Sequence, residues 1–133
     1  MTIDWQALRD AAAQAQTHAY APYSKFRVGA ALLTDDGRIV GGCNVENASY
    51  GLCICAERNA VFAAVAAGAR NFQALAVISS ADDPVTPCGA CRQVLAEFRP
   101  GFEVRCYGQS KGEVVHTVDG LLPHAFSETD LGS

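Results

Sequence analysis

The cysteines of this 133-residue chain are spaced in groups that could hold a metal ion or do redox chemistry. Cys88 and Cys91 form a CxxC pair, and on a helix two thiolates three residues apart project from the same face and can share one ion. Cys55 offers a third thiolate, because residues 56–67 have a helical pattern that starts directly after it. Tetrahedral zinc with three protein ligands keeps its fourth position for water, which is typical of a catalytic zinc site.

Two charged residues beside Cys55 fit the same chemistry. Glu57 follows Cys55 too closely to be a ligand on the same helix without strain, but it can reach a water on the ion and move its protons. Three thiolates on Zn²⁺ leave a formal charge of about -1, which weakens the acidification of that water. Helix N-termini offset this charge, and Arg58 can donate hydrogen bonds to the sulfurs. We therefore predict a catalytic role for Glu57 and a supporting role for Arg58.

Plainer interpretations of these residues stay open from the spacing alone. A CxxC pair is often a redox motif or two inert buried thiols, and a redox protein would need an exposed cysteine of low pKa and no metal. A structural zinc site would close the fourth position, for which Cys53 is the nearest candidate ligand. Cys43 and Cys106 lie in predicted strands, where a core role is expected. The occurrence of both cysteine groups at helix starts favours a catalytic zinc site.

The hydrophobic pattern predicts the elements that position these residues. Helices are expected from Asp4 to residue 20 or 21, over residues 56–67, and from Pro87 with Thr86 as its N-cap. Strands are expected over residues 28–33, 38–43, 72–79, 103–107 and 113–117. Gly41 and Gly42 indicate a bulge or a close approach of backbone. The order predicts an α/β fold with a central sheet of about five strands.

Two details of side-chain burial also follow from this pattern. Val61, Phe62 and Val65 are expected on the core face of their helix. The segment of residues 121–126 is too apolar to be a free end.

Composition and charge limit the class of protein. Half of the residues (50%) are hydrophobic and 18% are charged, as in a globular chain, and 133 residues are expected to form a single domain, 1–133. A net charge of -4 provides no basic field for a nucleic-acid polymer, and no apolar run is long enough for a membrane span. The first ten residues do not resemble a signal peptide, so we expect a reducing, cytoplasmic location.

Five segments together resemble the small, homo-oligomeric, zinc-dependent cytidine deaminases that use three cysteines. These segments are residues 21–26 with 28–32, then 42–47, 55–58, 87–93 and 121–123. The resemblance implies a three-layer α/β/α fold with a mixed sheet and helices on both faces. It also implies that Cys55, Cys88 and Cys91 hold one zinc ion per subunit, and that Glu57 shuttles protons while hydroxide attacks C4 of the cytosine ring.

The resemblance further implies a set of substrate-binding residues. Asn44 and Glu46 match the pair that binds the ribose, although an Asx turn would explain the same loop equally well. Phe26 matches an aromatic residue that packs on the pyrimidine, and would otherwise be assigned to the core. The backbone of Ala56 resembles the donor to the base carbonyl.

Two more aromatic residues are expected near a subunit boundary. Phe126 aligns with a residue that reaches into a neighbouring subunit's site, and Tyr50 is expected to face the substrate or an interface. The implied protein is a homotetramer with shared sites that converts cytidine, and 2′-deoxycytidine, to the uridine nucleoside and ammonia in pyrimidine salvage. The alternatives are a deaminase of another aminopyrimidine nucleoside, a polynucleotide editing enzyme, which the acidic charge disfavours, and a zinc-stabilised binding module without turnover.

Overall fold

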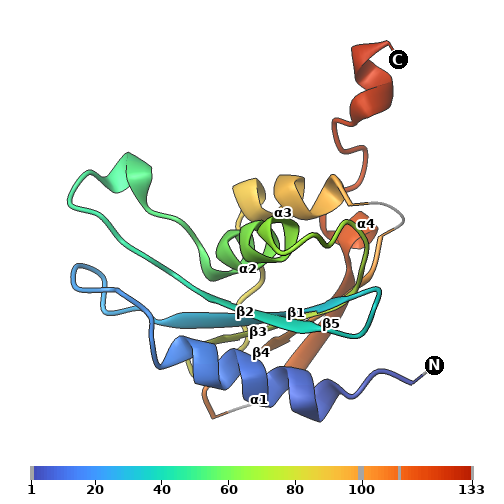
Figure 1. The fold of residues 1–133 in the computed structure, drawn as a ribbon. Coiled ribbons are helices and arrows are strands. Elements are labelled where there is room, and N and C mark those ends of the chain that lie inside the picture. Colours follow the sequence, from blue (N-terminus) through green and yellow to red (C-terminus); the bar gives the residue numbers. More distant parts are fainter. Residues whose placement is uncertain (1, 99–100, 111, 133) are drawn as a thin grey trace.

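A computed structural model describes residues 2–98, 101–110 and 112–132, and in this part of the chain five strands form one mixed sheet. The spatial order of the strands is β2-β1-β3-β4-β5 (Figure 1). Their bounds are β1 Val28–Thr34, β2 Ile39–Cys43, β3 Phe72–Ser79, β4 Glu103–Tyr107 and β5 Glu113–Thr117. β1 runs antiparallel to β2 and β3, β3 runs parallel to β4, and β4 runs antiparallel to β5. The predicted mixed sheet is confirmed.

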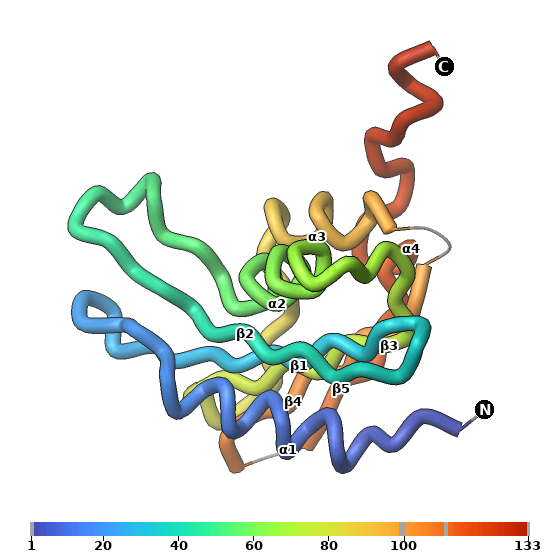
Figure 2. Tube along the Cα trace, viewed as in Figure 1, coloured from blue at the N-terminus to red at the C-terminus, as the bar shows by residue number. Residues whose placement is uncertain are grey.

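Helices cover both faces of this sheet. Helix α1 (Trp5–Gln16) lies against one face, while α2 (Ala56–Ala66) and α3 (Gly89–Ala96) lie side by side on the other (Figures 1 and 2). The side chains of β1 alternate accordingly, since Ala30 and Leu32 join the core under α2 and α3, and Ala31 joins the core under α1. This arrangement is the three-layer α/β/α fold that the sequence predicts.

Two glycines allow the helices to approach the sheet closely. A Cβ atom on Gly29 would lie 1.9 Å from the carbonyl oxygen of Ala12 in α1. A Cβ atom on Gly42 would lie 2.4 Å from the backbone nitrogen of Ala60 in α2. The pairing of β2 with β1 is continuous through Gly41 and Gly42. These two glycines therefore mark a close approach of backbone and not a bulge.

The core face of α2 differs from the predicted one at Phe62. The buried positions are occupied by Ala56, Ala60 and Ala64, together with Val61 and the site residue Glu57. Phe62 is 49% exposed, so its prediction as a core residue is wrong. Gly42 of β2 faces Ala56 and Ala60 of α2, where the close approach leaves room for small side chains only.

The first helix ends earlier than predicted. It stops at Gln16 instead of residue 20 or 21, because the following residues pair with a distant loop. The N–H of Tyr20 donates to the carbonyl of Asn44 (2.9 Å), and the N–H of Glu46 donates to the carbonyl of Tyr20 (2.8 Å). Figure 2 shows the two loops projecting on the same side of the sheet.

The third helix begins later than predicted. Its first residue is Gly89 and its N-cap is Cys88, not Pro87 with Thr86 as N-cap. The first helical hydrogen bond runs from the N–H of Arg92 to the carbonyl of Cys88 (3.0 Å). The carbonyl of Pro87 accepts from the Arg92 side chain instead (2.8 Å), so Pro87 lies outside the helix.

The C-terminal tail contains two short elements that the sequence analysis did not predict, α4 (Val118–Leu121) and the 3-10 helix Glu128–Leu131. Leu121 is buried, as the apolar pattern predicts, but Phe126 is 59% exposed. A second 3-10 helix, Tyr50–Leu52, lies in the loop before α2. None of the helices in the described ranges is both long and apolar enough to cross a membrane.

Candidate metal centre and active-site cavity

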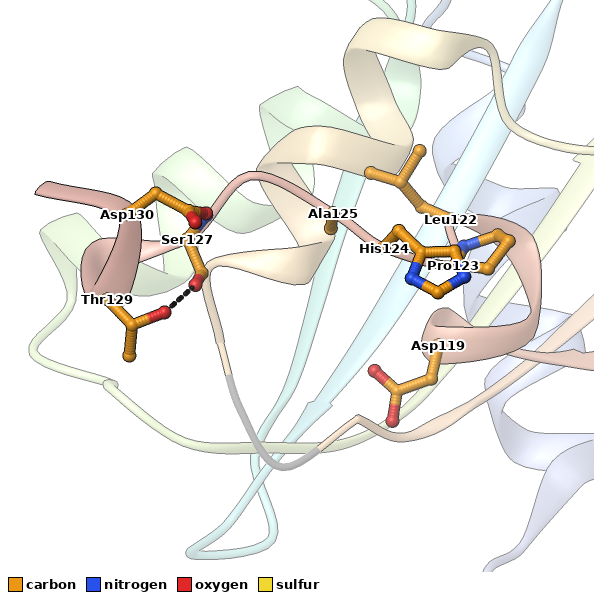
Figure 3. Close-up of a pocket in the computed structure, with 8 residues that line it drawn as sticks. All are labelled: Asp119, Leu122, Pro123, His124, Ala125, Ser127, Thr129 and Asp130. Carbon is orange, nitrogen blue, oxygen red and sulfur yellow. Dashed lines mark hydrogen bonds between the residues drawn. The ribbon is translucent and has the colours of Figure 1, made fainter.

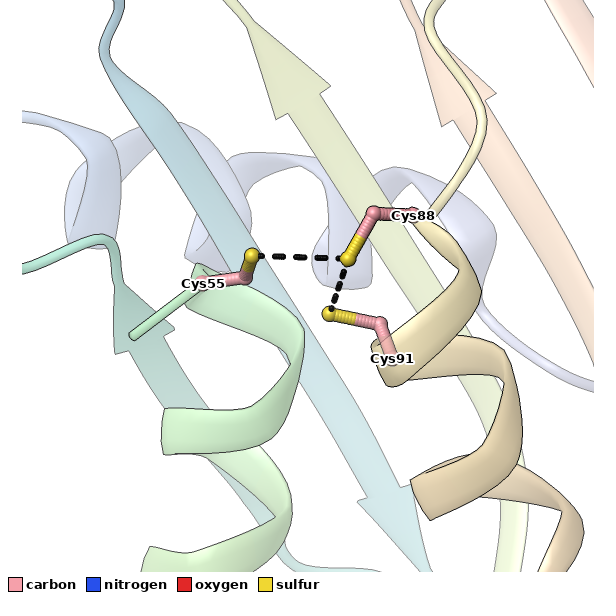
Figure 4. A group of neighbouring side chains, drawn as sticks. All are labelled: Cys55, Cys88 and Cys91. Atoms are coloured by element: carbon pink, nitrogen blue, oxygen red, sulfur yellow. Dashed lines mark hydrogen bonds between the residues drawn. The ribbon is translucent and has the colours of Figure 1, made fainter. Parts of the chain in front are cut away.

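Three thiols from two helix starts meet in one cluster (Figure 4). Cys55 is the N-cap of α2, and Cys88 is the N-cap of α3, where Cys91 lies in the first turn. The Sγ atoms of Cys55 and Cys88 are 3.7 Å apart, and those of Cys88 and Cys91 are 3.5 Å apart. The sequence prediction that these three thiols share one place is confirmed by the structure.

This donor set fits zinc. With Zn–S bonds of about 2.3 Å, the sulfurs of a tetrahedral site lie about 3.8 Å apart, close to the distances found. All three cysteines are free thiols, and the cluster runs from buried Cys91 through half-buried Cys55 to exposed Cys88. Cys53 is not part of the cluster, because its sulfur accepts the N–H of Asn47 (3.3 Å). The described cluster therefore offers three ligands and remains open on its exposed side.

The surroundings of the cluster favour thiolate at Cys55. A hydrogen bond from Cys91, together with Arg58 and Cys88, lowers the pKa of the Cys55 thiol to about 5. Because Cys91 donates to Cys55 and is buried, its own pKa is raised. The Nη2 atom of Arg58 lies 3.4 Å from the Cys55 sulfur, and this contact raises the pKa of Arg58. The buried Nε atom of Arg58 has no hydrogen-bond partner among the described residues. The guanidinium group donates instead to the sulfurs of Cys55 and Cys91.

Glu57 lies beside the thiols and is almost fully buried, with 5% of its surface exposed. Burial raises the pKa of its carboxyl group to about 7, and the negative charge of Cys55 adds to this effect. A carboxyl group with such a pKa can both accept and release a proton near neutral pH. This property is what proton transfer beside a metal-bound water requires.

Glu57 lines a cavity of about 190 Å³ together with five other residues predicted for the site. These are Phe26, Asn44, Cys55, Ala56 and Cys88. The cavity also has walls that the sequence analysis did not assign, namely Val28, Val77, Ser79, Val85 and Thr86. Val85 and Thr86 directly precede the Pro-Cys pair, which is the signal that could have identified them. The other three lie on predicted strands and gave no such signal.

The side chain of Asn44 bonds to the backbone next to the cavity. Its Oδ1 atom accepts the N–H of Val28 (2.8 Å), and its Nδ2 atom donates to the carbonyl of Phe26 (2.7 Å). These bonds reach residues distant in sequence, so the Asn44 side chain does not form an Asx turn; the Asx-type bond of this loop is made by Asn47, whose Oδ1 atom accepts the N–H of Ser49 (2.9 Å). Asn44 holds the backbone of Phe26, whose ring is 37% exposed.

Glu46 and Tyr50 line a separate hollow of about 310 Å³ instead. The carboxylate of Glu46 accepts the N–H groups of Tyr23 (2.9 Å) and Ser24 (3.1 Å) and the hydroxyl of Ser24. The Ser24 hydroxyl bond lowers the pKa of Glu46. Tyr50 is 74% exposed and contacts Tyr23 edge to face, at 6.1 Å between ring centres. Their predicted contacts with substrate stay predictions.

Phe126 also lies outside the cavity in this chain. Its carbonyl accepts from Gln93 (2.9 Å), and its ring is largely exposed. A larger hollow of about 520 Å³ lies beside the tail and is lined by Asp119, His124 and Asp130 among others (Figure 3). None of the predicted site residues lines that hollow. Cavity size alone would therefore not identify the thiols and Glu57 as the functional site.

Comparison with known proteins assigns the family. Residues 2–105 match the family model described as the cytidine and deoxycytidylate deaminase zinc-binding region. The chain belongs to this deaminase family. The match with a zinc-binding region and the cluster of three thiols confirm the prediction of zinc as the cofactor, one ion per chain.

Relatives in this family resemble the chain over almost its whole length. A cytidine deaminase from Sporosarcina psychrophila is 54% identical over 119 residues, which cover 89% of this chain and 88% of that protein. A cytidine deaminase from Halalkalibacterium halodurans is 49% identical and covers 97% of this chain and 98% of its own length. The crystal structure of cytidine deaminase from Burkholderia pseudomallei has a TM-score of 0.88 and 53% identity, and covers 95% of this chain and 100% of its own. The fold and the family predicted from sequence are thus confirmed.

Proposed function

We propose that this protein catalyses the hydrolytic deamination of cytidine, and of 2′-deoxycytidine, to the corresponding uridine nucleoside and ammonia. The observation that carries the proposal is a buried carboxylic acid, Glu57, which lines one small cavity together with Cys55 and Cys88, two members of the cluster of three thiols. The names of the relatives at 54% and 49% identity support cytidine as the substrate.

In this proposal Cys55, Cys88 and Cys91 are the zinc ligands. When bound there, zinc acidifies a water molecule and so supplies the nucleophile near neutral pH. Arg58 and the N-termini of α2 and α3 stabilise the negative charge of the thiolates, which would otherwise weaken that effect. The lowered pKa of Cys55 supports this division of roles.

Glu57 moves the protons. Its carboxylate takes a proton from the attacking water and gives it to N3 of the ring as the oxygen adds to C4. It then carries the second proton to the amino group, the C4–N bond breaks, and ammonia leaves. A pKa raised to about 7 suits a group that must act in turn as base and acid.

The other cavity residues hold the nucleoside in this proposal. Phe26 packs against the pyrimidine ring, and the N–H of Ala56, in the first turn of α2, donates to the base carbonyl. Asn44 and Glu46 bind the ribose hydroxyls. For Glu46 this requires release of contacts with Ser24 that it makes in the free chain.

We further propose that residues 1–133 act as a single domain within a homotetramer whose subunits share sites. The exposed rings of Phe126 and Tyr50 support this assembly, because neither ring finds a buried position within its own chain. A site made of three free thiols needs a reducing environment, which supports a cytoplasmic location. A role in pyrimidine salvage follows from the chemistry, since the product is a reusable uridine nucleoside.

The test is to incubate the purified protein with cytidine, 2′-deoxycytidine and an aminopyrimidine nucleoside with an altered sugar. Loss of the cytosine absorbance band and release of ammonia are followed, and bound zinc is measured in parallel. We expect conversion of the first two substrates and about one zinc per chain. Full zinc occupancy without any conversion would identify a binding module, and conversion of the third substrate alone would identify a different deaminase.

A further inference from the structure

One guanidinium group connects the wall of the cavity to the C-terminal tail. Arg92, in α3, donates from Nη2 to the hydroxyl of Thr86 (3.0 Å), from Nε to the carbonyl of Pro87 (2.8 Å) and from Nη1 to the carbonyl of Leu121 (2.9 Å). Thr86 lines the cavity, and Cys88 follows Pro87 directly. We propose that Arg92 is a positioning residue, which holds the segment of residues 86–88 where the metal site and the cavity need it. This inference rests on the proposed function.

The position of this segment is not determined by a regular element. Helix α3 begins at Gly89, so Thr86 and Pro87 lie outside its backbone hydrogen-bond ladder, and proline has no N–H to donate. The two acceptors there, the hydroxyl of Thr86 and the carbonyl of Pro87, belong to successive residues. Both bind to the same guanidinium group of Arg92. Arginine suits this task because its planar group has donors in fixed directions.

A small movement of the segment would reach the chemistry. The sulfur of Cys88 is the exposed member of the cluster and lies 3.7 Å from that of Cys55 on the other helix. Displacement of residues 86–88 changes this separation, and with it the geometry offered to zinc. The same displacement moves the cavity wall at Thr86 relative to Glu57, and errors of about 1 Å in positioning can cost on the order of 100-fold in rate.

The tail is coupled to this wall through neighbouring residues of α3. Leu121, the last residue of α4, shares Arg92 with the cavity wall, and Gln93 holds the carbonyl of Phe126 (2.9 Å). The tail and the cavity therefore have a common anchor.

The test compares Arg92→Gln and Arg92→Lys with a matched control, Arg70→Gln. Arg70 also donates to backbone carbonyls, those of Val65 (3.0 Å) and Ala69 (2.8 Å), but lies outside the cavity. Two quantities are measured: kcat/KM for cytidine, and the rate at which a chromophoric chelator removes zinc from the protein well below its melting temperature.

We expect Arg92→Gln to lower kcat/KM on the order of 100-fold and to speed zinc release, with Arg92→Lys intermediate because an ammonium cannot span three acceptors. Arg70→Gln should change neither quantity. Equal zinc release and equal activity in the Arg92 and Arg70 variants would overturn the proposal and leave Arg92 a purely structural role.

A second variant keeps the proposal testable if Arg92→Gln does not fold. Thr86→Val removes one acceptor of the guanidinium and keeps the size of the side chain. We expect it to speed zinc release less than Arg92→Gln does. In the double variant it should speed zinc release little further, because both changes break the same hydrogen bond between Arg92 and Thr86. Additive effects would overturn the shared-contact argument. If the wild type does not convert cytidine, the proposed function fails, and zinc release still decides the role of Arg92.

Discussion

Cys91 and Glu57 are almost fully buried at the starts of two helices, whereas Tyr50 and Phe126 are 74% and 59% exposed on loops. The sequence predicts that all four serve one site. We call the three thiols and Glu57 the floor of the site, and Phe26, Glu46, Tyr50 and Phe126 its rim. The floor is complete within one chain. Of the four rim residues, Phe26 alone lines the cavity that Glu57, Cys55 and Cys88 also line.

The difference follows from how each region is held. Helix starts and core packing determine where the floor residues lie, so the arrangement exists before substrate arrives. In the rim, the carboxylate of Glu46 is engaged by Tyr23 and Ser24 of the neighbouring loop, and Tyr50 and Phe126 are mostly exposed. We therefore expect changes in the floor to abolish metal binding or chemistry, and changes in the rim to weaken substrate binding.

The largest effect is expected from Cys55→Ala. Loss of one of three ligands should remove both zinc and turnover, as measured by metal analysis and the cytidine assay. Cys43→Ala, which removes a thiol from β2, is the control and should keep both. Full zinc occupancy in Cys55→Ala, combined with zinc loss in Cys53→Ala, would show that Cys53 is the true ligand.

Glu57→Gln should separate metal binding from chemistry within the floor. The amide has the shape of the carboxyl group but cannot carry its proton, so zinc should stay while kcat falls on the order of 100-fold or more. Glu97→Gln, in an exposed position after α3, is the matched control and should retain wild-type kcat. Full activity of Glu57→Gln would refute the proposed proton transfer.

Arg58→Ala should make zinc binding more sensitive to acid. Together with the Cys91 hydrogen bond, which is the larger cause, Arg58 lowers the pKa of Cys55 from 9.0 to about 5. The contribution of this thiolate to the free energy of folding is fully present above about pH 9 and is lost as the pH falls toward 5. Without Arg58 the pKa rises and protons displace the metal earlier. Zinc occupancy measured against pH should shift upward by at least about one unit, and an unchanged curve would exclude this role.

The smallest effect is expected in the rim, from Glu46→Gln. The amide oxygen can still accept the N–H groups of Tyr23 and Ser24, so the loop should keep its conformation. Loss of the charge should raise KM for cytidine roughly 10-fold, with little change in kcat, since an uncharged hydrogen bond is weaker by about 1 kcal/mol or more. A fall in kcat comparable to that of Glu57→Gln would place Glu46 with the floor.

Local sequence patterns predicted some elements well. The bounds of β3, β4 and β5 agree with the prediction, because each is a short run of strand-forming residues between clear turn signals. The three thiols were predicted together because residue type and spacing are properties of the chain itself. The family resemblance depends on the same kind of information.

Other boundaries depended on distant contacts and could not be predicted in this way. Helix α1 ends at Gln16 because the chain beyond it pairs with the loop at Asn44, and α3 begins after Pro87 because Arg92 takes the Pro87 carbonyl. The exposure of Phe62 follows from which side of α2 packs against the sheet, and that side carries Ala56, Ala60 and Ala64. None of these causes is visible in a window of neighbouring residues.

By itself the sequence determined the chemistry that is available: three soft ligands, a carboxylic acid next to one of them, and helix starts to carry both. The tertiary structure decided the quantities on which function depends. It placed sulfurs 33 residues apart in sequence at 3.7 Å, buried Glu57 so that its pKa rises to about 7, and bound the Glu46 carboxylate to the backbone of the loop after α1. The reason is physical: residue type and spacing are local, whereas burial and the distance between separate segments arise only when the whole chain packs.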